Sequence, residues 1–185
     1  RNDIPAYANI MESEDVDPES GLLYYDQFMK QADTRTQLAL TTCYLACFQL
    51  EGFEHLRHFV GYQKAADTMA EIGEIFKNFQ KLRNSRNVLC GRKSGHELML
   101  LIQDCDRQDL KVDLQNIMAQ INEILLKLPT AETFTTYCGY SNYPRHAATV
   151  EQMVKNSGFA VYEAVMFRKS EPHYFSPDAF KRQET

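Results

Sequence analysis

Apolar and polar positions follow two different patterns in the first half of the chain. Residues 38–50, "LALTTCYLACFQL", contain no charged side chain. An uninterrupted run of this kind predicts a strand that is buried on both faces and central in its sheet. Within residues 53–80 the apolar positions instead recur at intervals of three and four, at Ala65, Met69, Ile72, Phe76 and Phe79. This spacing predicts an amphipathic helix that packs on the core.

Similar patterns continue to residue 167 and complete a predicted fold. A Ser-Gly pair inside "KSGH" separates two apolar runs and predicts a β-hairpin. The other predicted elements are a helix at 22–34, hairpin strands at 86–92 and 97–103, a helix carrying Leu110, Leu114, Ile117, Ile121 and Leu125, a strand at 133–141 and a helix at 150–167. The order β-α-β-β-α-β, with extra helices, predicts an α+β fold of the ferredoxin-like, palm type. In that arrangement helices cover one face of a mostly antiparallel sheet.

Composition narrows the class of protein. A chain of 185 residues with 44% hydrophobic and 24% charged residues fits one globular domain. The net charge of -5 leaves no basic footprint for nucleic acid. Five cysteines without a CxxC pair argue against a disulfide framework or a zinc site and favour reduced thiols in the cytoplasm. No apolar run approaches the roughly 20 residues of a membrane span, and the start at Arg1 suggests a piece of a longer protein.

Five short stretches, in order, resemble landmarks of one family. They are "DPESGLLYYDQF" from Asp17, "FQLEGFEHLRHFVG" from Phe48, "GRKSGHEL" from Gly91, "TTYCGYS" from Thr135 and "SGFAVYEAV" from Ser157. Together they resemble the GGDEF domain, the diguanylate cyclase family, over residues 17–169. The five-letter signature itself is replaced by Ser94-Gly95-His96-Glu97-Leu98.

The resemblance implies a reaction for which this chain lacks ligands. Members of the family join two GTP molecules into cyclic-di-GMP with Mg²⁺ held by carboxylates, because anionic oxygen ligands suit that ion. The two positions that the family uses for these carboxylates hold Gln49 and His96. We therefore expect no catalytic residue, with Glu97 as a vestige of the signature. Glu51 matches a further acid of the first strand, and a transition metal held by His96 and Glu51 is an alternative.

Nucleotide contacts are altered in the same way. The guanine-reading Asn of the family aligns with Arg57, and the acid that accompanies it aligns with Ala66, one residue before Asp67. Gly95 keeps the turn of the signature. The phosphate-binding Lys corresponds to Val165, with Lys169 four residues later. The inhibitory RxxD motif is missing, since neither Arg83 nor Arg86 has an Asp three residues on. GTP and cyclic-di-GMP binding are expected to be weak or lost, and Mg²⁺ would enter only with residual GTP binding.

These inferences favour a catalytically inactive GGDEF domain that acts as a regulatory or interaction module. The alternative is a GTP-binding allosteric sensor or a residual cyclase. We expect an acidic linker at residues 1–16, the domain at 17–169 and a linker at 170–185, whose "YFSPDAF" resembles the exit toward an EAL phosphodiesterase domain. The expected partners are neighbouring sensor or EAL domains and a second copy in a homodimer, with no nucleic acid. The expected location is cytoplasmic, including the cytoplasmic part of a membrane-anchored protein.

Overall fold

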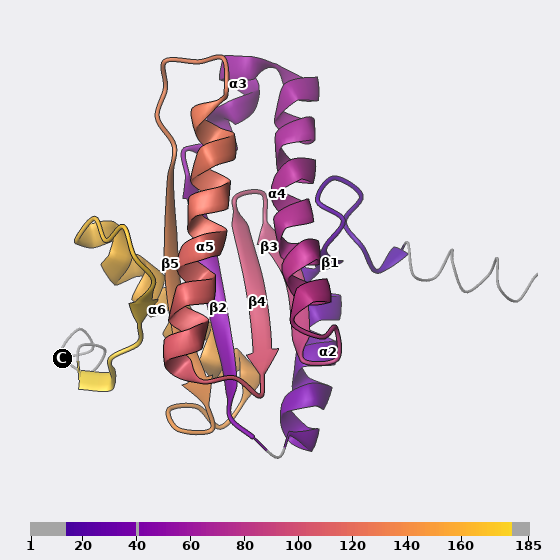
Figure 1. Ribbon diagram of the computed structural model, residues 1–185, viewed down its shortest axis with the longest axis vertical. Coiled ribbons are helices and arrows are strands. Elements are labelled where there is room, and N and C mark those ends of the chain that lie inside the picture. The colour runs from indigo at the N-terminus through magenta and orange to yellow at the C-terminus, as the bar shows by residue number, and fades with distance from the viewer. Residues whose placement is uncertain (1–13, 40, 179–185) are drawn as a thin grey trace, which may run out of the picture.

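A six-stranded open sheet forms the centre of the computed structural model, which describes residues 14–39 and 41–178 (Figure 1). Its strands are β1 (Leu23–Tyr24), β2 (Cys43–Glu51), β3 (Val88–Ser94), β4 (Glu97–Gln103), β5 (Thr135–Tyr143) and β6 (His173–Tyr174), in the order β1-β3-β4-β2-β5-β6. The helices are α2 (Tyr25–Leu38), the 3-10 turn η1 (Phe53–His55), α3 (Leu56–Val60), α4 (Tyr62–Leu82), α5 (Arg107–Leu126) and α6 (Val150–Met166). The four central strands are antiparallel, while β1 and β6 add short parallel pairings at the edges. The α+β prediction is therefore confirmed.

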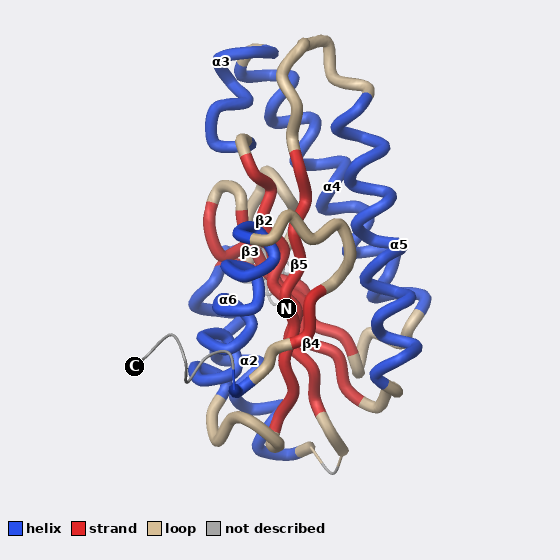
Figure 2. The backbone as a smooth tube through the Cα atoms, turned by 90° about the vertical axis from the view of Figure 1, so that its left-hand side faces the viewer, coloured by secondary structure: helices blue, strands red, loops and turns tan. Residues whose placement is uncertain are grey.

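Helices cover both faces of the sheet, so the expectation of a single covered face was wrong. Figure 2 shows α4 and α5 on one side of the strands and α2 and α6 on the other. Alternate residues of β2 explain this arrangement, because Phe48 packs in the cluster under α4 and α5 while Leu45 packs in the cluster under α2 and α6. Side chains of a strand alternate between the two faces of a sheet, and both faces of β2 are apolar. Each face therefore needs its own layer of helices.

The central strand begins later than its apolar run suggested. Helix α2 continues to Leu38, whose side chain is exposed, and β2 begins at Cys43. Cys43 lies opposite Gln103 and Tyr143, the last residues of β4 and β5. Among the described residues of the run before Cys43, none pairs with a neighbouring strand. The absence of charge along the run could not reveal where the pairing begins.

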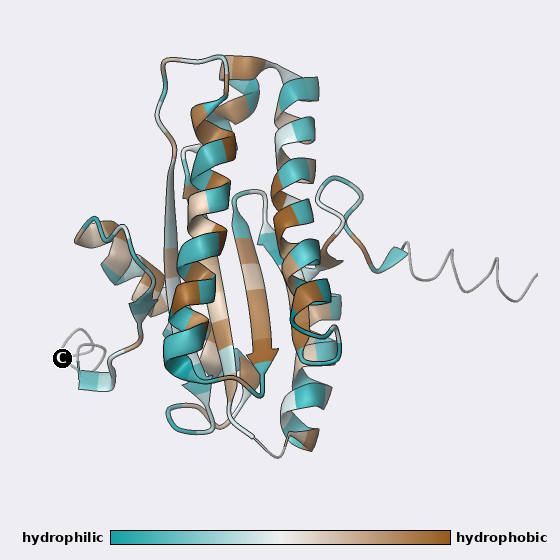
Figure 3. Ribbon diagram, in the orientation of Figure 1, coloured by the Kyte–Doolittle hydropathy of each residue, from teal (hydrophilic) through white to brown (hydrophobic). Residues whose placement is uncertain are grey.

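The long helix predicted at 53–80 is interrupted near its start. Gly61 has φ 86°, in the left-handed region that favours glycine, and it separates α3 from α4. The predicted stripe is confirmed on α4, where Met69, Ile72 and Phe76 are fully buried. Helices α5 and α6 also lie where their patterns placed them. In Figure 3, hydrophilic and hydrophobic bands alternate along α4 and α5, and β4 is hydrophobic through most of its length.

The hairpin of β3 and β4 is confirmed, with a shorter connection than expected. β3 extends to Ser94 and leaves only Gly95 and His96 between the strands, and an irregularity in register falls between Arg92 and Ser94. A bulge of this kind bends a strand and redirects its side chains. None of the helices in the described part of the chain is long and apolar enough to cross a membrane.

Candidate functional site

The hairpin turn packs directly against the end of the central strand. Gln49 lies opposite Glu97 of β4 on one side and opposite Tyr137 of β5 on the other. The amide of Leu50 donates a hydrogen bond to the carbonyl oxygen of His96 at 2.8 Å. The fold therefore brings Gln49, His96 and Glu97 close together along the chain backbone. Glu97 also accepts a hydrogen bond from the Ser94 hydroxyl at 2.9 Å.

Arg92 fastens this turn to the opening segment of the domain. Its guanidinium donates to the carbonyl oxygens of Ser94 and Gly95 at 3.1 and 2.9 Å. It also forms ion pairs with Asp17 at 2.8 Å and Glu19 at 3.0 Å. The Arg92 and Asp17 side chains are only 13% and 12% exposed, so this pair is largely withdrawn from water. We call these five residues the Arg92 clamp.

Asp17 is also the organising residue of the turn that precedes β1. Its carboxylate accepts hydrogen bonds from the amide and the hydroxyl of Ser20 at 3.1 and 2.7 Å. Burial opposes ionisation of Asp17, but the hydrogen bonds from Arg92 and Ser20, together with the Arg92 charge, hold its pKa below the usual value. The turn packs closely on α4 at Gly73, where a Cβ atom would collide with the Ser20 carbonyl oxygen.

A second arginine contacts the strand ends, meaning here the end of β2 and the start of β5. Arg168 follows α6, and its Nη1 atom donates to Glu51 Oε1 at 3.0 Å and to the Tyr137 hydroxyl at 2.8 Å. The Arg168 and Glu51 side chains are 71% and 39% exposed. The Tyr137 side chain is almost fully buried. Glu51 is thus occupied by an internal cation, a partner that the sequence did not indicate.

A cleft of about 920 Å³ opens beside the hairpin turn. Its charged lining residues are Asp17, Glu19, Asp26, Arg57, Arg92 and Lys93, and the others are Pro18, Tyr24, Tyr25, Tyr62, Ser94 and Gly95. Of the residues proposed to contact nucleotide, Arg57 and Gly95 line this cleft. The Arg57 guanidinium lies 4.9 Å from the centre of the Tyr62 ring and 3.9 Å from Glu19.

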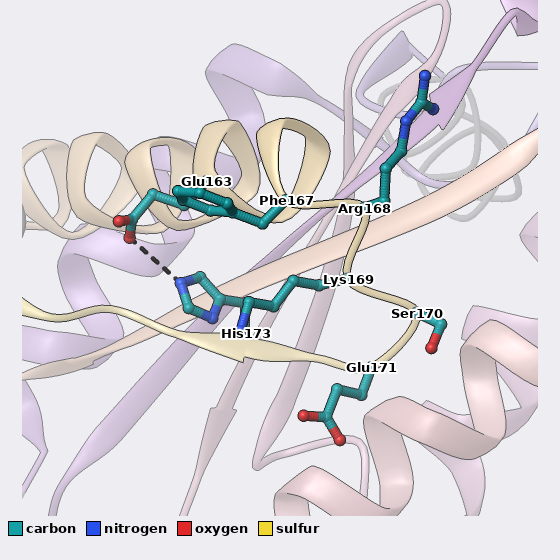
Figure 4. A pocket seen from close by; sticks show the side chains of 7 residues that line it. All are labelled: Glu163, Phe167, Arg168, Lys169, Ser170, Glu171 and His173. Carbon is teal, nitrogen blue, oxygen red and sulfur yellow. Dashed lines mark hydrogen bonds and ion pairs between the residues drawn. The ribbon is translucent and has the colours of Figure 1, made fainter.

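The other two proposed nucleotide contacts lie elsewhere. Asp67 is on α4 and accepts a hydrogen bond from Gln63 at 2.9 Å, outside the lining of the cleft. Lys169 lines a separate hollow of about 610 Å³ formed by the end of α6 and the following loop. Figure 4 shows that hollow, with Glu163 and His173 facing each other at 3.2 Å and Arg168 pointing away from them. The four positions therefore do not form one binding site.

The comparison with protein families decides the family. The family model described as "Diguanylate cyclase, GGDEF domain" matches residues 15–169. The chain belongs to the GGDEF domain family.

Three relatives of this GGDEF domain share at most a quarter of their aligned residues with it, and MbaA is considerably longer. The biofilm architecture maintenance protein MbaA of Vibrio cholerae is 25% identical over 166 residues, which cover 81% of this chain and 20% of MbaA. The chain therefore spans about a fifth of that relative. The structure of the coiled coil and GGDEF domain of DgcB from Caulobacter crescentus, in complex with c-di-GMP, matches with a TM-score of 0.79. That match has 12% identity and covers 92% of this chain and 90% of the DgcB chain. The S helix-GGDEF-EAL structure of Vibrio cholerae LapD matches with a TM-score of 0.74 and 17% identity, covering 95% of this chain and 40% of the chain in that structure.

The acids and histidines of this GGDEF domain are dispersed. Within residues 14–39 and 41–178, no three His, Cys, Asp or Glu side chains gather closely enough to hold a metal ion. Glu51 is paired with Arg168 and Glu97 with Ser94. Arg83, which has no Asp three residues later in the sequence, forms an ion pair with Asp113 of α5.

Proposed function

We propose that this GGDEF domain makes no cyclic-di-GMP and serves as a regulatory and interaction module of a longer protein. The observation that carries the proposal is the pairing of Gln49 with Glu97, beside His96. The proposal is supported by a neutral amide and an imidazole at the two positions where the family resemblance implies anionic ligands.

Mg²⁺ does not fit the side chains at these strand ends. The ion prefers hard oxygen ligands, most of them anionic or water. Gln49 and His96 supply no carboxylate, and the Glu51 carboxylate is neutralised by Arg168 at 3.0 Å. Loss of two carboxylates from a metal-dependent phosphoryl transfer is expected to cost about 3 kcal/mol, or roughly a hundredfold in rate.

Product formation tests the proposal directly. The purified chain is incubated with GTP and either Mg²⁺ or Mn²⁺, and cyclic-di-GMP is measured by chromatography. A GGDEF domain that retains both carboxylates serves as the positive control. We expect the chain to give no product above the blank without protein, and clear turnover with either metal would contradict the proposal.

The cleft beside the hairpin supports a second candidate, a sensor that binds GTP without turning it over. Its aromatic and cationic lining suits a nucleotide, but Arg92 is already bonded to two carboxylates. The three carboxylates of the lining balance its three cations, so the cleft offers no net positive charge to a triphosphate. For this reason we favour the module over the sensor.

Calorimetry with GTP distinguishes the two candidates. The module predicts no binding heat, whereas the sensor predicts micromolar binding. If heat is seen, Tyr62→Ala tests the cleft, because Tyr62 lies in its lining and is 68% exposed. Tyr162→Ala is the matched control, since Tyr162 is on α6 and outside the cleft. An equal loss of GTP affinity in the two variants would mean that the nucleotide does not bind specifically in the cleft.

The regulated neighbour is proposed to lie in the same polypeptide. Both the length of MbaA and the EAL domain in the LapD structure support this arrangement. The resemblance of residues 170–185 to a segment leading to an EAL domain points the same way, although residues 179–185 lie outside the described part. A sensor domain on the other side, a homodimer and a cytoplasmic location belong to the same proposal. Sequencing of the full-length product and its size in solution test them.

A further inference from the structure

Arg168 is the residue directly after the C-cap of α6, where a left-handed backbone commonly ends a helix. Its φ is 52°, in the left-handed region where residues other than glycine are uncommon. Figure 4 shows the side chain directed away from the hollow lined by Glu163 and His173. Its Nη1 atom instead bonds Glu51 and Tyr137. The left-handed turn belongs to the end of α6, because the amide of Lys169 donates a hydrogen bond across it to the carbonyl oxygen of Ala164 at 2.8 Å. The side-chain contacts then fix the guanidinium beside the end of β2.

The guanidinium lies beside the position at which the family resemblance places a metal ligand. Glu51 follows Gln49 by two residues on β2, so both side chains project on the same face of the sheet. Tyr137, the second partner of Arg168, lies directly opposite Gln49. Hydrogen bonds to Tyr137 and Glu51 raise the pKa of Arg168, which keeps its positive charge at this place.

Arg168 also begins the loop that leads to β6, residues 168–172, here called the exit loop. Two further contacts hold this region, an ion pair between Lys111 and Glu171 at 3.8 Å and a hydrogen bond between His173 and Glu163 at 3.2 Å. Those contacts connect it to α5 and α6. Of the ion pairs made by the described exit loop, that of Arg168 contacts Glu51, the last residue of β2.

Resting on the proposed function, we propose that Arg168 is an internal cation at the strand ends: it neutralises Glu51 in place of a divalent metal ion and ties the exit loop to β2 and β5. A metal ion and Arg168 then compete for the same carboxylate and repel each other. The competition is reciprocal by thermodynamic linkage, so occupation of the strand ends by a metal ion loosens the exit loop.

Manganese binding tests the competition. The Gln49→Asp/His96→Asp double variant of the whole chain restores the two carboxylates and is titrated with Mn²⁺, following the electron paramagnetic resonance signal of the free ion. Adding Arg168→Met should tighten Mn²⁺ binding by about tenfold, because a unit positive charge is removed within a few ångströms of a divalent ion. Lys169→Met in the same background is the matched control and should change the affinity by less than about twofold, since Lys169 lines the separate hollow and interactions between distant charges are screened.

Two results of this titration would overturn the inference. One is equal affinity with and without Arg168→Met. The other is no Mn²⁺ binding even when Arg168 is removed from the restored background, because the strand ends would then offer no site for which Arg168 competes.

Hydrogen exchange of the single Arg168→Met variant tests the tie to the exit loop without the other substitutions. The amides of residues 169–171, 173 and 174 should exchange about fivefold faster than in the unmodified chain, as expected when a local contact that opposes opening is lost. Unchanged exchange would refute the tie. The proposed function is judged separately, from product formation by the unmodified chain, so either idea can fail alone.

Discussion

Two arginines hold different segments near the hairpin end of the sheet, in different physical settings: Arg92 holds the hairpin turn, and Arg168 contacts β2 and β5. Arg92 contacts Asp17 at 2.8 Å and Arg168 contacts Glu51 at 3.0 Å, so the two ion pairs have similar geometry. The Arg92 pair has side chains 13% and 12% exposed, whereas the Arg168 pair has side chains 71% and 39% exposed. Breaking a buried pair leaves an uncompensated charge away from water, while an exposed pair is replaced by water.

The difference shows how a GGDEF domain can keep its fold while its site changes. Arg92 and Asp17 lie in two of the stretches that resemble the family's landmarks, and they hold the hairpin against the opening segment. Gln49, Glu51 and His96 lie at the rim of the sheet, where substitution removes few packed atoms. The fold of this region therefore depends on Arg92 and Asp17, whereas its capacity to bind a metal ion depends on other residues at the rim of the sheet. Three substitutions test this separation of fold from chemistry.

The largest effect is expected for Arg92→Met. The substitution removes four contacts and leaves Asp17 largely buried without its cation. Loss of one partner from such a pair should reduce the free energy of unfolding by about 3 kcal/mol. Urea unfolding followed by circular dichroism measures the change. Lys93→Met is the matched control, because its ammonium lies 4.0 Å from Glu97 and is more exposed. Equal effects in the two variants would contradict the special role of the Arg92 clamp.

Asp17→Asn should have an intermediate effect that depends on pH. The pKa of Asp17 is lowered from 3.8 in the folded protein, so the ionised carboxylate stabilises the fold above pH 3.8. This contribution is lost as the pH falls through the lowered folded-state pKa. At pH 7 the variant should be less stable by about 2 kcal/mol, the scale of a hydrogen bond to a charged group. The difference from wild type should shrink progressively below about pH 4.

Unfolding curves measured from pH 7 to pH 2 check this dependence. Asp26→Asn changes an exposed carboxylate on α2 in the same isosteric way and should not reproduce the pattern. A difference between wild type and Asp17→Asn that stays constant with pH would assign the loss to shape rather than to charge.

The sequence predicted those helices and strands in which apolar side chains recur at a regular spacing. The stripe at Met69, Ile72 and Phe76 predicted α4 correctly, because a helix must bury one continuous face. The two-residue strands β1 and β6 were missed, since so short a segment carries no period. The break at Gly61 was missed for a related reason, because apolar residues continue on both sides of it.

The site was predictable only where neighbouring strands determine it. Gln49, His96 and Glu97 meet because the hairpin pairs with the first long strand, an arrangement implied by the family resemblance. The contact between Arg168 and Glu51 joins residues 117 positions apart and depends on a left-handed backbone at Arg168. The basic pair at 168–169 was the signal available in the sequence, and it does not say which residue turns toward the sheet.

The smallest effect is expected for Glu51→Gln, the exposed counterpart of Asp17→Asn. Glu51 lies at the end of β2 opposite Thr135, and its backbone pairing with β5 does not depend on the carboxylate. The amide oxygen of Gln still accepts a hydrogen bond from Arg168, and surrounding water replaces the lost charge. The melting temperature should therefore change by less than about 2 °C, measured at pH 7 beside Asp17→Asn. A Glu51→Gln loss as large as that of Asp17→Asn would mean that the strand ends also support the fold, and that the separation of fold from chemistry does not hold in this domain.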